Sequence, residues 1–206
     1  MADNVKLYST SAARNKGVIA EAFAKLMPDA EHVLELASGS GEHGEAVLRR
    51  MKSVTWQGSD PDPAARASTS ARMEELGQPP ALALDTRTEG WWAEPPGPFD
   101  ALVAINMIHI TSRAGVEGLF QGAAAILSPG GHLFLYGPFS RRGVTEESNR
   151  HFDASLKARD PSWGVRDLDD MLQPLAARFA LSLAHVEPVP ANNHVVLFMQ
   201  EVHGES

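Results

Sequence analysis

The chain of 206 residues contains no cysteine, which excludes disulfides, thiolate metal sites and thiol catalysis. Basic residues are in the minority, because 18 Lys and Arg stand against 26 Asp and Glu. A net charge of −8 argues against electrostatic binding to phosphates, so we expect no nucleic-acid partner. No apolar run approaches membrane-spanning length, and residues 1–25 lack a signal-peptide core. We therefore expect no membrane association and a cytoplasmic location.

The composition is 43% hydrophobic, which is enough for one compact core. We expect a single domain over residues 1–206, with an N-terminal helical cap at 1–30 and a lid-like insertion at 137–166. The sequence does not indicate an oligomeric state. The histidines are not spaced as metal ligands are, so we expect no metal site. The histidines considered are His43, His132, His151 and His194.

The most informative segment runs from a short apolar stretch into three glycines. Residues 33–36 read as a buried strand with one acid, Glu35, and Gly39, Gly41 and Gly44 follow at the turn into a helix. Glycine permits the φ angles of such a turn and lets a ligand approach the backbone closely. Free N–H groups and the helix dipole attract an anionic group there. The segment predicts a nucleotide-type cofactor loop.

The glycines alone do not name the cofactor. The spacing Gly39-x-Gly41-x-x-Gly44 also fits the dinucleotide fingerprint, which keeps NAD as an alternative. In its acidic Glu35 just before the turn, the segment resembles class I S-adenosylmethionine (SAM) methyltransferases. In that class, an acid at this position interacts with the methionine end of the cofactor. Glu35 could instead be a buried acid that loop N–H groups satisfy.

Hydrophobic periodicity and turn residues predict alternating strands and helices. The expected strands are 32–36, 54–58, 81–84, 101–106, 132–136, 181–189 and 194–202, and the expected helices are 12–27, 42–51, 64–76, 116–127 and 167–179. Such alternation implies a parallel sheet with helices on both faces. The short connection 190–193 makes the last two strands antiparallel. The fold class is thus α/β, with a seven-stranded, mostly parallel sheet that ends in an antiparallel hairpin.

This series resembles the Rossmann-like fold of class I SAM-dependent methyltransferases. More closely, segments that span nearly the whole chain resemble the methyltransferase-like 26 family; they are residues 14–16, 37–43, 56–62, 105–110, 135–139, 160–167 and 190–193. That family is assigned to methyl transfer largely by its fold. The resemblance implies SAM as cofactor and S-adenosylhomocysteine as product, with no metal, and leaves the acceptor open. Ala37 departs from the general class pattern, where a first glycine is usual, but it matches the closer family.

The resemblance places cofactor contacts at the carboxyl ends of the strands. Asp60 ends the second strand, where its carboxylate can accept both ribose hydroxyls, or it caps the turn that follows. Asp85 ends the third strand and faces the adenine amino group, with the Thr86 N–H toward a ring nitrogen, or it caps the next segment. The other expected cofactor residues near these positions are Ala37, Ser38, Gly39, Gly41, His43, Pro61 and Met107.

The methionine end of the cofactor is expected near two further residues. Asn106 ends the fourth strand, where its backbone carbonyl can hold the ammonium group. Arg14 can pair with the carboxylate through a charge-assisted contact. Arg14 could equally be a solvated residue in the first turns of the N-terminal helix.

Methyl transfer requires alignment of nucleophile, carbon and sulfur and the exclusion of water. A base helps only if the nucleophile arrives protonated. Two residues at the expected catalytic rim are candidates for catalysis: His109, just beyond Asn106, and Tyr136, at the end of the fifth strand. Each has a structural alternative, as a packed histidine or a core tyrosine.

Candidate substrate-binding residues come from three parts of the chain: Asn15, Phe139, Trp163, Arg166, Asn192 and Asn193. The two asparagines of the final turn lie at the active-site edge, because the last strand runs backwards, or they supply positive φ angles. Trp163 could merely clamp its own loop. The basic residues of segment 137–166 hint at an acidic substrate, although a solvated mixed-charge surface is the simpler interpretation.

The sequence thus predicts a SAM-dependent methyltransferase that acts on a small molecule. The expected acceptor is an oxygen of an acidic metabolite or natural-product intermediate. Two alternatives stay open: an NAD-dependent oxidoreductase and a non-catalytic SAM-binding partner protein. The antiparallel end and the lack of a clear Tyr-Lys or His-Asp hydride site disfavour the oxidoreductase.

Overall fold

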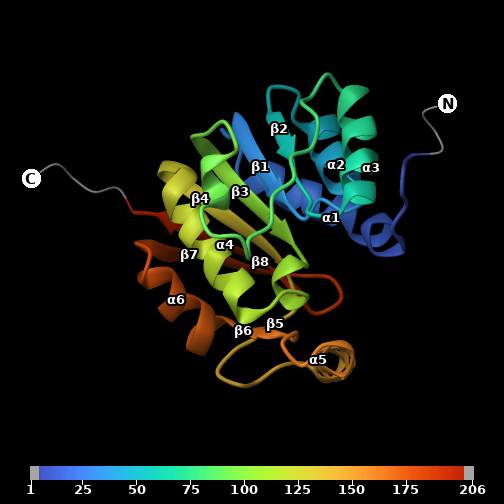
Figure 1. The fold of residues 1–206 in the computed structure, drawn as a ribbon. Coiled ribbons are helices and arrows are strands. Elements are labelled where there is room, and N and C mark those ends of the chain that lie inside the picture. The colour runs from blue at the N-terminus through green and yellow to red at the C-terminus, as the bar shows by residue number, and fades with distance from the viewer. Residues whose placement is uncertain (1–4, 202–206) are drawn as a thin grey trace, which may run out of the picture.

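A six-stranded sheet of order β2-β1-β3-β4-β8-β7 organises the chain (Figure 1). The computed structural model describes residues 5–201. The strands of this sheet are β1 His32–Leu36, β2 Thr55–Gly58, β3 Phe99–Ile105, β4 Leu127–Gly137, β7 Leu181–Val189 and β8 Asn193–Gln200. β2, β1, β3 and β4 are parallel, whereas β8 is antiparallel to β4 and to β7. The mostly parallel sheet with an antiparallel C-terminal hairpin is confirmed.

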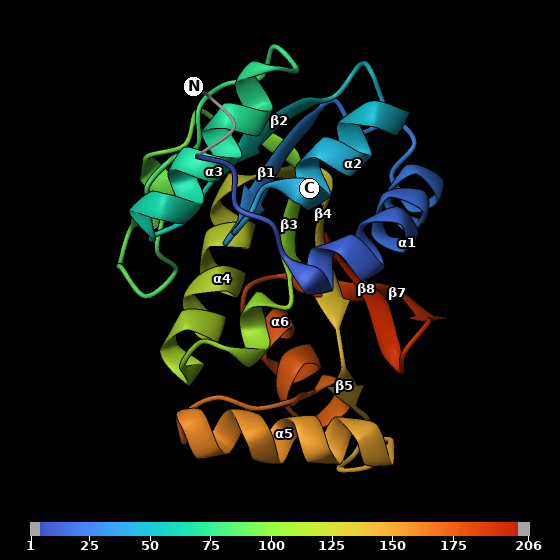
Figure 2. The same cartoon turned by 90° about the vertical axis from the view of Figure 1, so that its right-hand side faces the viewer.

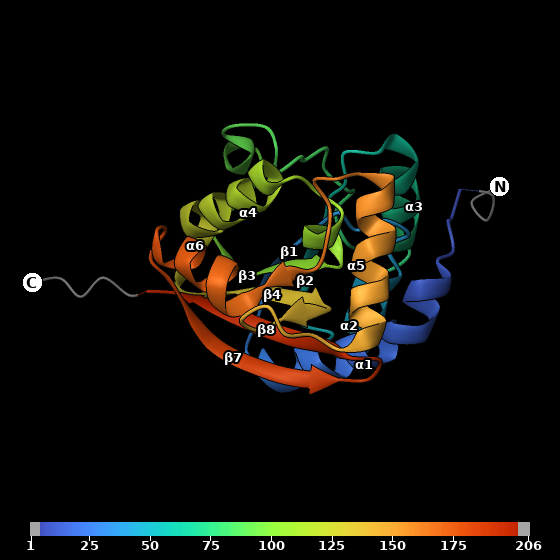
Figure 3. The same cartoon turned by 90° about the horizontal axis from the view of Figure 1, so that it is seen from below.

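Helices cover both faces of the sheet, as predicted. The α-helices of these two layers are α1 Thr10–Leu26, α2 Glu42–Arg50, α3 Pro63–Glu74, α4 Arg113–Ile126 and α6 Gln173–Ala177, whereas α5 Glu147–Arg159 lies outside them (Figures 2 and 3). Alternate residues of β3 point to opposite faces, so Val103 packs with α1 and α2 while Leu102 packs with α4 and α6 (Figure 1). Phe23 of α1 meets the Trp56 ring edge-on at 5.7 Å between centroids. Two apolar layers therefore hold the sheet edge rigidly in place.

The expected strand 81–84 is wrong as a full strand, which reduces the predicted seven strands to six. A single parallel bridge joins Leu82 to Ser59, with hydrogen bonds from the Asp60 N–H to the Leu82 carbonyl and from the Leu82 N–H to the Gly58 carbonyl. Pro79 and Pro80 come directly before and lack N–H donors, so the ladder does not extend. The segment still reaches the carboxyl edge of β2.

A second correction concerns the expected helix 167–179. A π-helical turn, Leu168–Leu172, precedes the short α6. Pro174 lacks the N–H that a regular α-helical turn would direct to Asp170, so the wider turn is favoured there. Among the described residues, no helix is both long enough and apolar enough to cross a membrane.

The segment between β4 and β6 crosses the carboxyl edge of the sheet. Figures 2 and 3 show α5 lying across the strand ends, outside the two helical layers. β5 (Phe139–Ser140) and β6 (Arg166–Asp167) pair in parallel as a small second sheet, which joins the two ends of this segment. Residues 138–165 therefore stand over the edge where a parallel sheet presents ligands.

Candidate functional site

The turn after β1 has the backbone that the glycine pattern predicts. Ala37, Gly39 and Gly41 have φ angles of 53°, 58° and 79°. A Cβ on Gly41 would lie 2.9 Å from Thr69 Cα, so α3 packs against the loop at that point. A Cβ on Gly39 would meet no atom within 4 Å, so this side of the loop is open. The loop is closed against α3 at Gly41 and free toward the sheet edge at Gly39.

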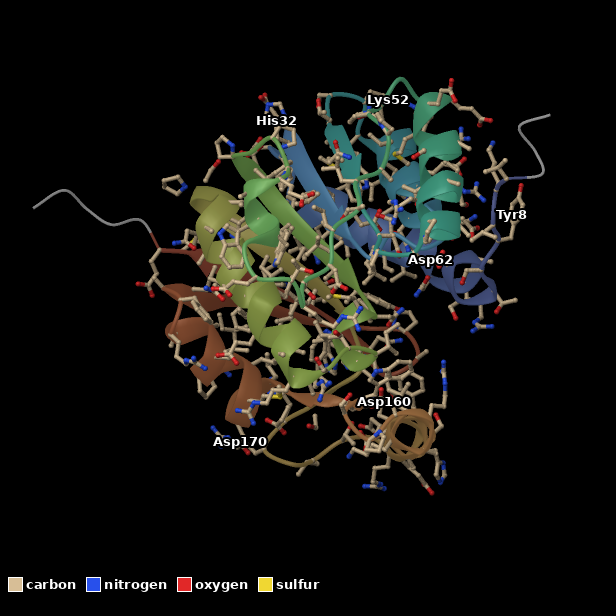
Figure 4. The ribbon with its side chains drawn as sticks, in the orientation of Figure 1. Tyr8, His32, Lys52, Asp62, Asp160 and Asp170 are labelled. Atoms are coloured by element: carbon tan, nitrogen blue, oxygen red, sulfur yellow. The ribbon has the colours of Figure 1, made fainter. Side chains whose placement is uncertain are left out.

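A cavity of about 430 Å³ opens on that free side, and we call it the loop cavity. It is lined by Leu36, Ala37, Gly39, Asp60, Pro61, Leu84, Asp85, Thr86, Arg87, Met107, Ile110, Thr111, Ser112, Asp160, Ser162 and Trp163. Asp160 lies at the lower side of the molecule in Figure 4, where α5 ends. The cavity thus brings together seven of the expected cofactor residues and one expected substrate residue, Trp163.

Asp60 has two roles in the wall of the loop cavity. Its Oδ2 accepts from the Gly39 N–H at 3.0 Å and its Oδ1 accepts from the Asp62 N–H at 2.9 Å. The second bond is the expected turn cap, and the first ties the carboxylate to the glycine loop. Each oxygen keeps a further lone pair, so capping and ligand binding are compatible.

Asp85 and Thr86 form the wall opposite the loop. Arg87 donates to both carboxylate oxygens of Asp85, with the shortest contact at 2.6 Å, and lowers the pKa of that carboxyl. The Thr86 hydroxyl is buried and has no hydrogen-bond partner among the described residues. Trp163 lines the same cavity. The Arg159 guanidinium stacks over its ring, with 5.0 Å between the guanidinium carbon and the ring centroid.

A second cavity, of about 460 Å³, lies at the same sheet edge, and we call it the Tyr136 cavity. It is lined by Ser11, Arg14, Asn15, Val18, Asn106, Tyr136, Pro138, Ser148, Asn149, Phe152, Pro190, Ala191 and Asn193. Asn106 (φ 56°) and Met107 are neighbours in the chain, yet they line different cavities. The two cavities therefore flank the turn at the end of β3.

Arg14 is the charged side chain in the lining of the Tyr136 cavity. It is exposed and forms no ion pair or hydrogen bond with the described residues. Asn15 lies beside it, and its Oδ1 is 3.0 Å from His43 Nε2. The first turns of α1 thus reach the carboxyl edge, as expected.

Tyr136 closes the floor of its cavity. Burial raises the pKa of the phenol, while hydrogen bonds with the side chains of Asn15 and Asn193 act in the opposite direction. Because the pKa rises overall, the phenol is protonated near neutral pH. It is suited to holding a ligand by a hydrogen bond rather than to removing a proton.

His109 is not placed as a base. The ring is buried, packs edge-on against Phe139 at 5.4 Å, and lines neither cavity. Burial lowers its pKa to about 3, and neither ring nitrogen has a hydrogen-bond partner among the described residues. In this structure His109 packs against Phe139 and lines neither cavity, which does not support the expected role as a base.

Glu35, Ser38 and His43 support the loop or its neighbours and line neither cavity. The Glu35 carboxylate is buried and accepts from the Trp56 indole N–H at 3.1 Å. The Ser38 hydroxyl donates to the Glu35 carbonyl and accepts from the Ser59 N–H. Each of these side chains is hydrogen-bonded within the protein, and their expected contacts with the cofactor stay predictions.

Three expected substrate residues also line neither cavity. Phe139 is buried, and Arg166 donates to the carbonyls of Ile108, Thr111 and Ser162, so its guanidinium is used in holding the cavity wall. Asn192 donates to Ser148 Oγ and adopts a φ of 56°, the turn role considered for it.

Two basic residues of segment 137–166 form ion pairs with described residues. Arg141 binds Asp169, and Lys157 binds Asp153. These pairs agree with a mixed-charge surface, and the acidic substrate stays a prediction.

Several lining residues were not predicted from the sequence. Ser148, Asn149 and Phe152 of α5 line the Tyr136 cavity, while Ile110, Thr111 and Ser112 line the loop cavity. Phe152 and Ile110 are large apolar side chains that are 41% and 46% exposed, which is the signal that could have indicated a rim. That exposure is visible only in the folded chain.

Comparison with protein families gives one match. The family model described as "Protein of unknown function (DUF938)" covers residues 6–200. The chain belongs to the DUF938 family. For this DUF938 chain, the closer resemblance to the methyltransferase-like 26 family stays a prediction.

Three of the solved structures that are similar to the DUF938 chain are named as methyltransferases. An O-methyltransferase family protein from Burkholderia thailandensis matches with TM-score 0.78 and 18% identity over 94% of this chain and 57% of its own. Mitomycin 7-O-methyltransferase matches with TM-score 0.77 and 15% identity, over 93% and 54%. Human N-acetylserotonin methyltransferase, in complex with SAM, matches with TM-score 0.75 and 12% identity, over 93% and 53%.

These identities show the fold alone. The Rossmann-like methyltransferase fold predicted from the sequence is confirmed. The DUF938 chain spans little more than half the length of these proteins.

Proposed function

We propose that this protein is a SAM-dependent methyltransferase with a small-molecule acceptor. The observation that carries the proposal is the pair of cavities flanking the end of β3, one beside the glycine loop and one beside Arg14 and Tyr136. A ligand lying across Asn106 and Met107 would place its two ends in different chemical surroundings. The methyltransferase fold of the similar structures supports the proposal.

The loop cavity fits the adenosine part of SAM. Asp60 presents lone pairs to the ribose hydroxyls, and the open side of Gly39 lets a ligand approach the backbone. Asp85 would accept from the adenine amino group, and Met107 and Ile110 supply apolar walls to the same cavity. The mixture of apolar walls with a few polar groups is typical of a cofactor site.

The methionine part of SAM fits the turn at Asn106 and the exposed Arg14. Arg14 is free to pair with a carboxylate, because no described side chain neutralises it. The Asn106 backbone, turned by its positive φ angle, would hold the ammonium group through its carbonyl.

Methyl transfer mainly requires the protein to align the acceptor with the methyl group and to exclude water. SAM, when bound, supplies an electrophilic methyl group on a sulfonium. The chain aligns the acceptor in the Tyr136 cavity and excludes water with α1 and the segment 138–165, which together act as a lid. The protonated Tyr136 phenol donates a hydrogen bond to the acceptor.

An acidic oxygen suits this site as the methyl acceptor. His109 is buried away from both cavities, and Tyr136 stays protonated near neutral pH, so neither provides a strong base. An acceptor that arrives already ionised, such as a phenolate or a carboxylate, needs no base. The names of two similar structures also specify O-methylation for those proteins.

Calorimetry with SAM, S-adenosylhomocysteine and NAD tests the cofactor. We expect the two sulfur ligands to bind and NAD to show no heat of binding. Tight binding of NAD without either sulfur ligand contradicts the proposal and favours an oxidoreductase.

A screen of phenols and carboxylic acids, read by mass spectrometry for a gain of one methyl group, tests the reaction. Turnover of a defined acceptor excludes a protein that only binds SAM. Binding of SAM with no methylated product across the screen favours the non-catalytic alternative.

A further inference from the structure

Four side chains from four elements form a polar row beside the Tyr136 cavity. His43 of α2 contacts Asn15 of α1, with 3.0 Å between Nε2 and Oδ1. Tyr136, near the end of β4, lines the same cavity as Asn15 and Asn193, and hydrogen bonding from these two side chains acts to lower the pKa of its phenol. Asn15, Tyr136 and Asn193 line the cavity, whereas His43 stands behind them. The row runs from the helix after the glycine loop to the floor of the second cavity.

The chemistry of these groups determines which of them donates and which accepts each hydrogen bond. Asn15 Oδ1 can only accept, so His43 Nε2 must carry the hydrogen. The ring is neutral, because burial lowers its pKa to about 4, with Glu42 raising that value and Lys16 lowering it. Its single proton therefore stays on Nε2, and Asn15 is held with its amide nitrogen toward Tyr136.

We propose that His43 is a positioning residue of the acceptor site, which fixes the Tyr136 hydroxyl through the side chain of Asn15. The inference rests on the proposed function, because it takes the Tyr136 cavity as the place of the methyl acceptor. A Tyr136 oxygen that accepts from Asn15 has its own proton free for donation. The row thus selects acceptors with an ionised or strongly hydrogen-bond-accepting oxygen.

The charged groups near the row bear on whether His43 acts on the acceptor site or on the cofactor. Arg14 is the charged group that lines the same cavity as Tyr136, and Glu42 and Lys16 face His43. Glu42 is itself paired, because its two oxygens accept from Lys16 Nζ at 2.9 Å and from the Ser9 N–H at 2.8 Å. His43 contacts the site through Asn15 and lines neither cavity.

The ionisation of Tyr136 reports on the row without any acceptor. The chain has only two tyrosines, and Tyr8 is 75% exposed, so ¹³Cζ-tyrosine NMR gives two resonances that Tyr8→Phe assigns. We expect His43→Phe and Asn15→Leu each to raise the titration midpoint of Tyr136 by about half a pH unit or more, because a donor to its oxygen is lost. His43→Gln keeps an N–H donor and is expected to restore the wild-type midpoint. His132→Phe, at the opposite edge of the sheet, is the matched control and leaves the midpoint unchanged.

A midpoint that stays or falls in both His43→Phe and Asn15→Leu overturns the proposal, since it shows that Asn15 gives no donor to Tyr136. Calorimetry with S-adenosylhomocysteine distinguishes a failure of the His43 proposal from a failure of the proposed methyltransferase function. Equal affinity in wild type and His43→Phe supports a role on the acceptor side, whereas a tenfold loss assigns His43 to the cofactor and overturns it. Failure of the wild-type protein to bind S-adenosylhomocysteine refutes the proposed function itself, whatever the tyrosine titration shows.

Discussion

Asp60 is bound to the glycine loop by its own hydrogen bonds. Its carboxylate accepts from Gly39 and from Asp62, so the same group shapes the loop and faces the cavity. Replacement by alanine would therefore change the loop and the ligand contact together. Asp60→Asn is the sharper variant, because one amide oxygen still accepts a backbone hydrogen bond while the charge is lost.

We expect Asp60→Asn to lower the affinity for SAM by roughly ten- to a hundredfold, about 1.5–3 kcal/mol, because charge-assisted bonds to the ribose are lost. Calorimetry measures the change. Asp62→Ala is the matched control: it removes the N-cap of α3, where Asp62 accepts from the Ala65 N–H, and should cost about 1 kcal/mol of stability. Equal losses of affinity in both variants would assign Asp60 to turn capping alone.

Glu35 predicts a pH dependence of folding. Burial raises its pKa from 4.5 to about 7, although the Trp56 indole hydrogen bond acts the other way. Because the folded state binds this proton more tightly, the stabilisation is complete below pH 4.5 and is lost as pH rises through 7. The loss amounts to about 3 kcal/mol for such a displacement of the pKa.

Glu35→Gln is expected to remove most of that slope, since the amide does not titrate. Urea unfolding at pH 5, 6, 7 and 8, followed by circular dichroism, measures the free energy of unfolding. The exposed variant Glu89→Gln should keep the wild-type slope. A Glu35→Gln slope equal to that of the wild type would show that the carboxyl titrates normally in the folded protein.

At the scale of elements, α1 and the chain before it are bound to the back of the glycine loop. The buried Glu42 accepts from the Ser9 N–H and from Lys16, and the buried Arg72 donates to the Leu7 carbonyl and to the Ser40 carbonyl. Deletion of residues 1–16 would leave both charges short of partners, which is strongly destabilising. A truncation therefore does not isolate the lid role of α1, and a point variant is needed.

Arg14→Gln tests whether α1 contributes to the site. We expect SAM affinity to fall about three- to tenfold, because a charge-assisted contact becomes a neutral one. The melting temperature should not change, since Arg14 is exposed and unpaired among the described residues. Arg49→Gln, on the exposed face of α2, is the control in both measurements. Unchanged SAM affinity in Arg14→Gln would remove α1 from the proposed lid.

At the scale of the whole molecule, the cofactor is expected to bridge elements that the sheet alone does not connect. The loop cavity has walls from the glycine loop, from the ends of β1 and β2, and from residues 160–163 after α5. A ligand that binds the folded state alone stabilises it by mass action.

SAM at a hundred times its dissociation constant should therefore add about 2.7 kcal/mol of stability. For a chain of this size, that corresponds to a rise in melting temperature of roughly 5–10 °C. Differential scanning fluorimetry measures the rise, with NAD at the same concentration as the negative control. A rise with NAD and none with SAM would favour the oxidoreductase.

The order of strands and helices was readable from the sequence, because it depends on local periodicity and on turn residues. The strand 32–36, the hairpin at residues 190–193 and the conformations of Gly39 and Gly41 were predicted within that local pattern. Asp60 was found for the same reason, since a carboxylate just after a buried strand must lie at the carboxyl edge. Residues 81–84 failed as a strand because two prolines limit pairing to one bridge.

Only the tertiary structure decided which side chains meet at the site. The Tyr136 cavity is lined by Asn15 of α1 and Phe152 of α5, which are far apart in the sequence, and no local pattern encodes that arrangement. The same packing buries His109 and occupies Arg166 with backbone carbonyls. Burial and hydrogen-bond partners depend on the whole fold, so the sequence alone indicated the sheet edge where the candidate site lies, and the packing decided which residues line it.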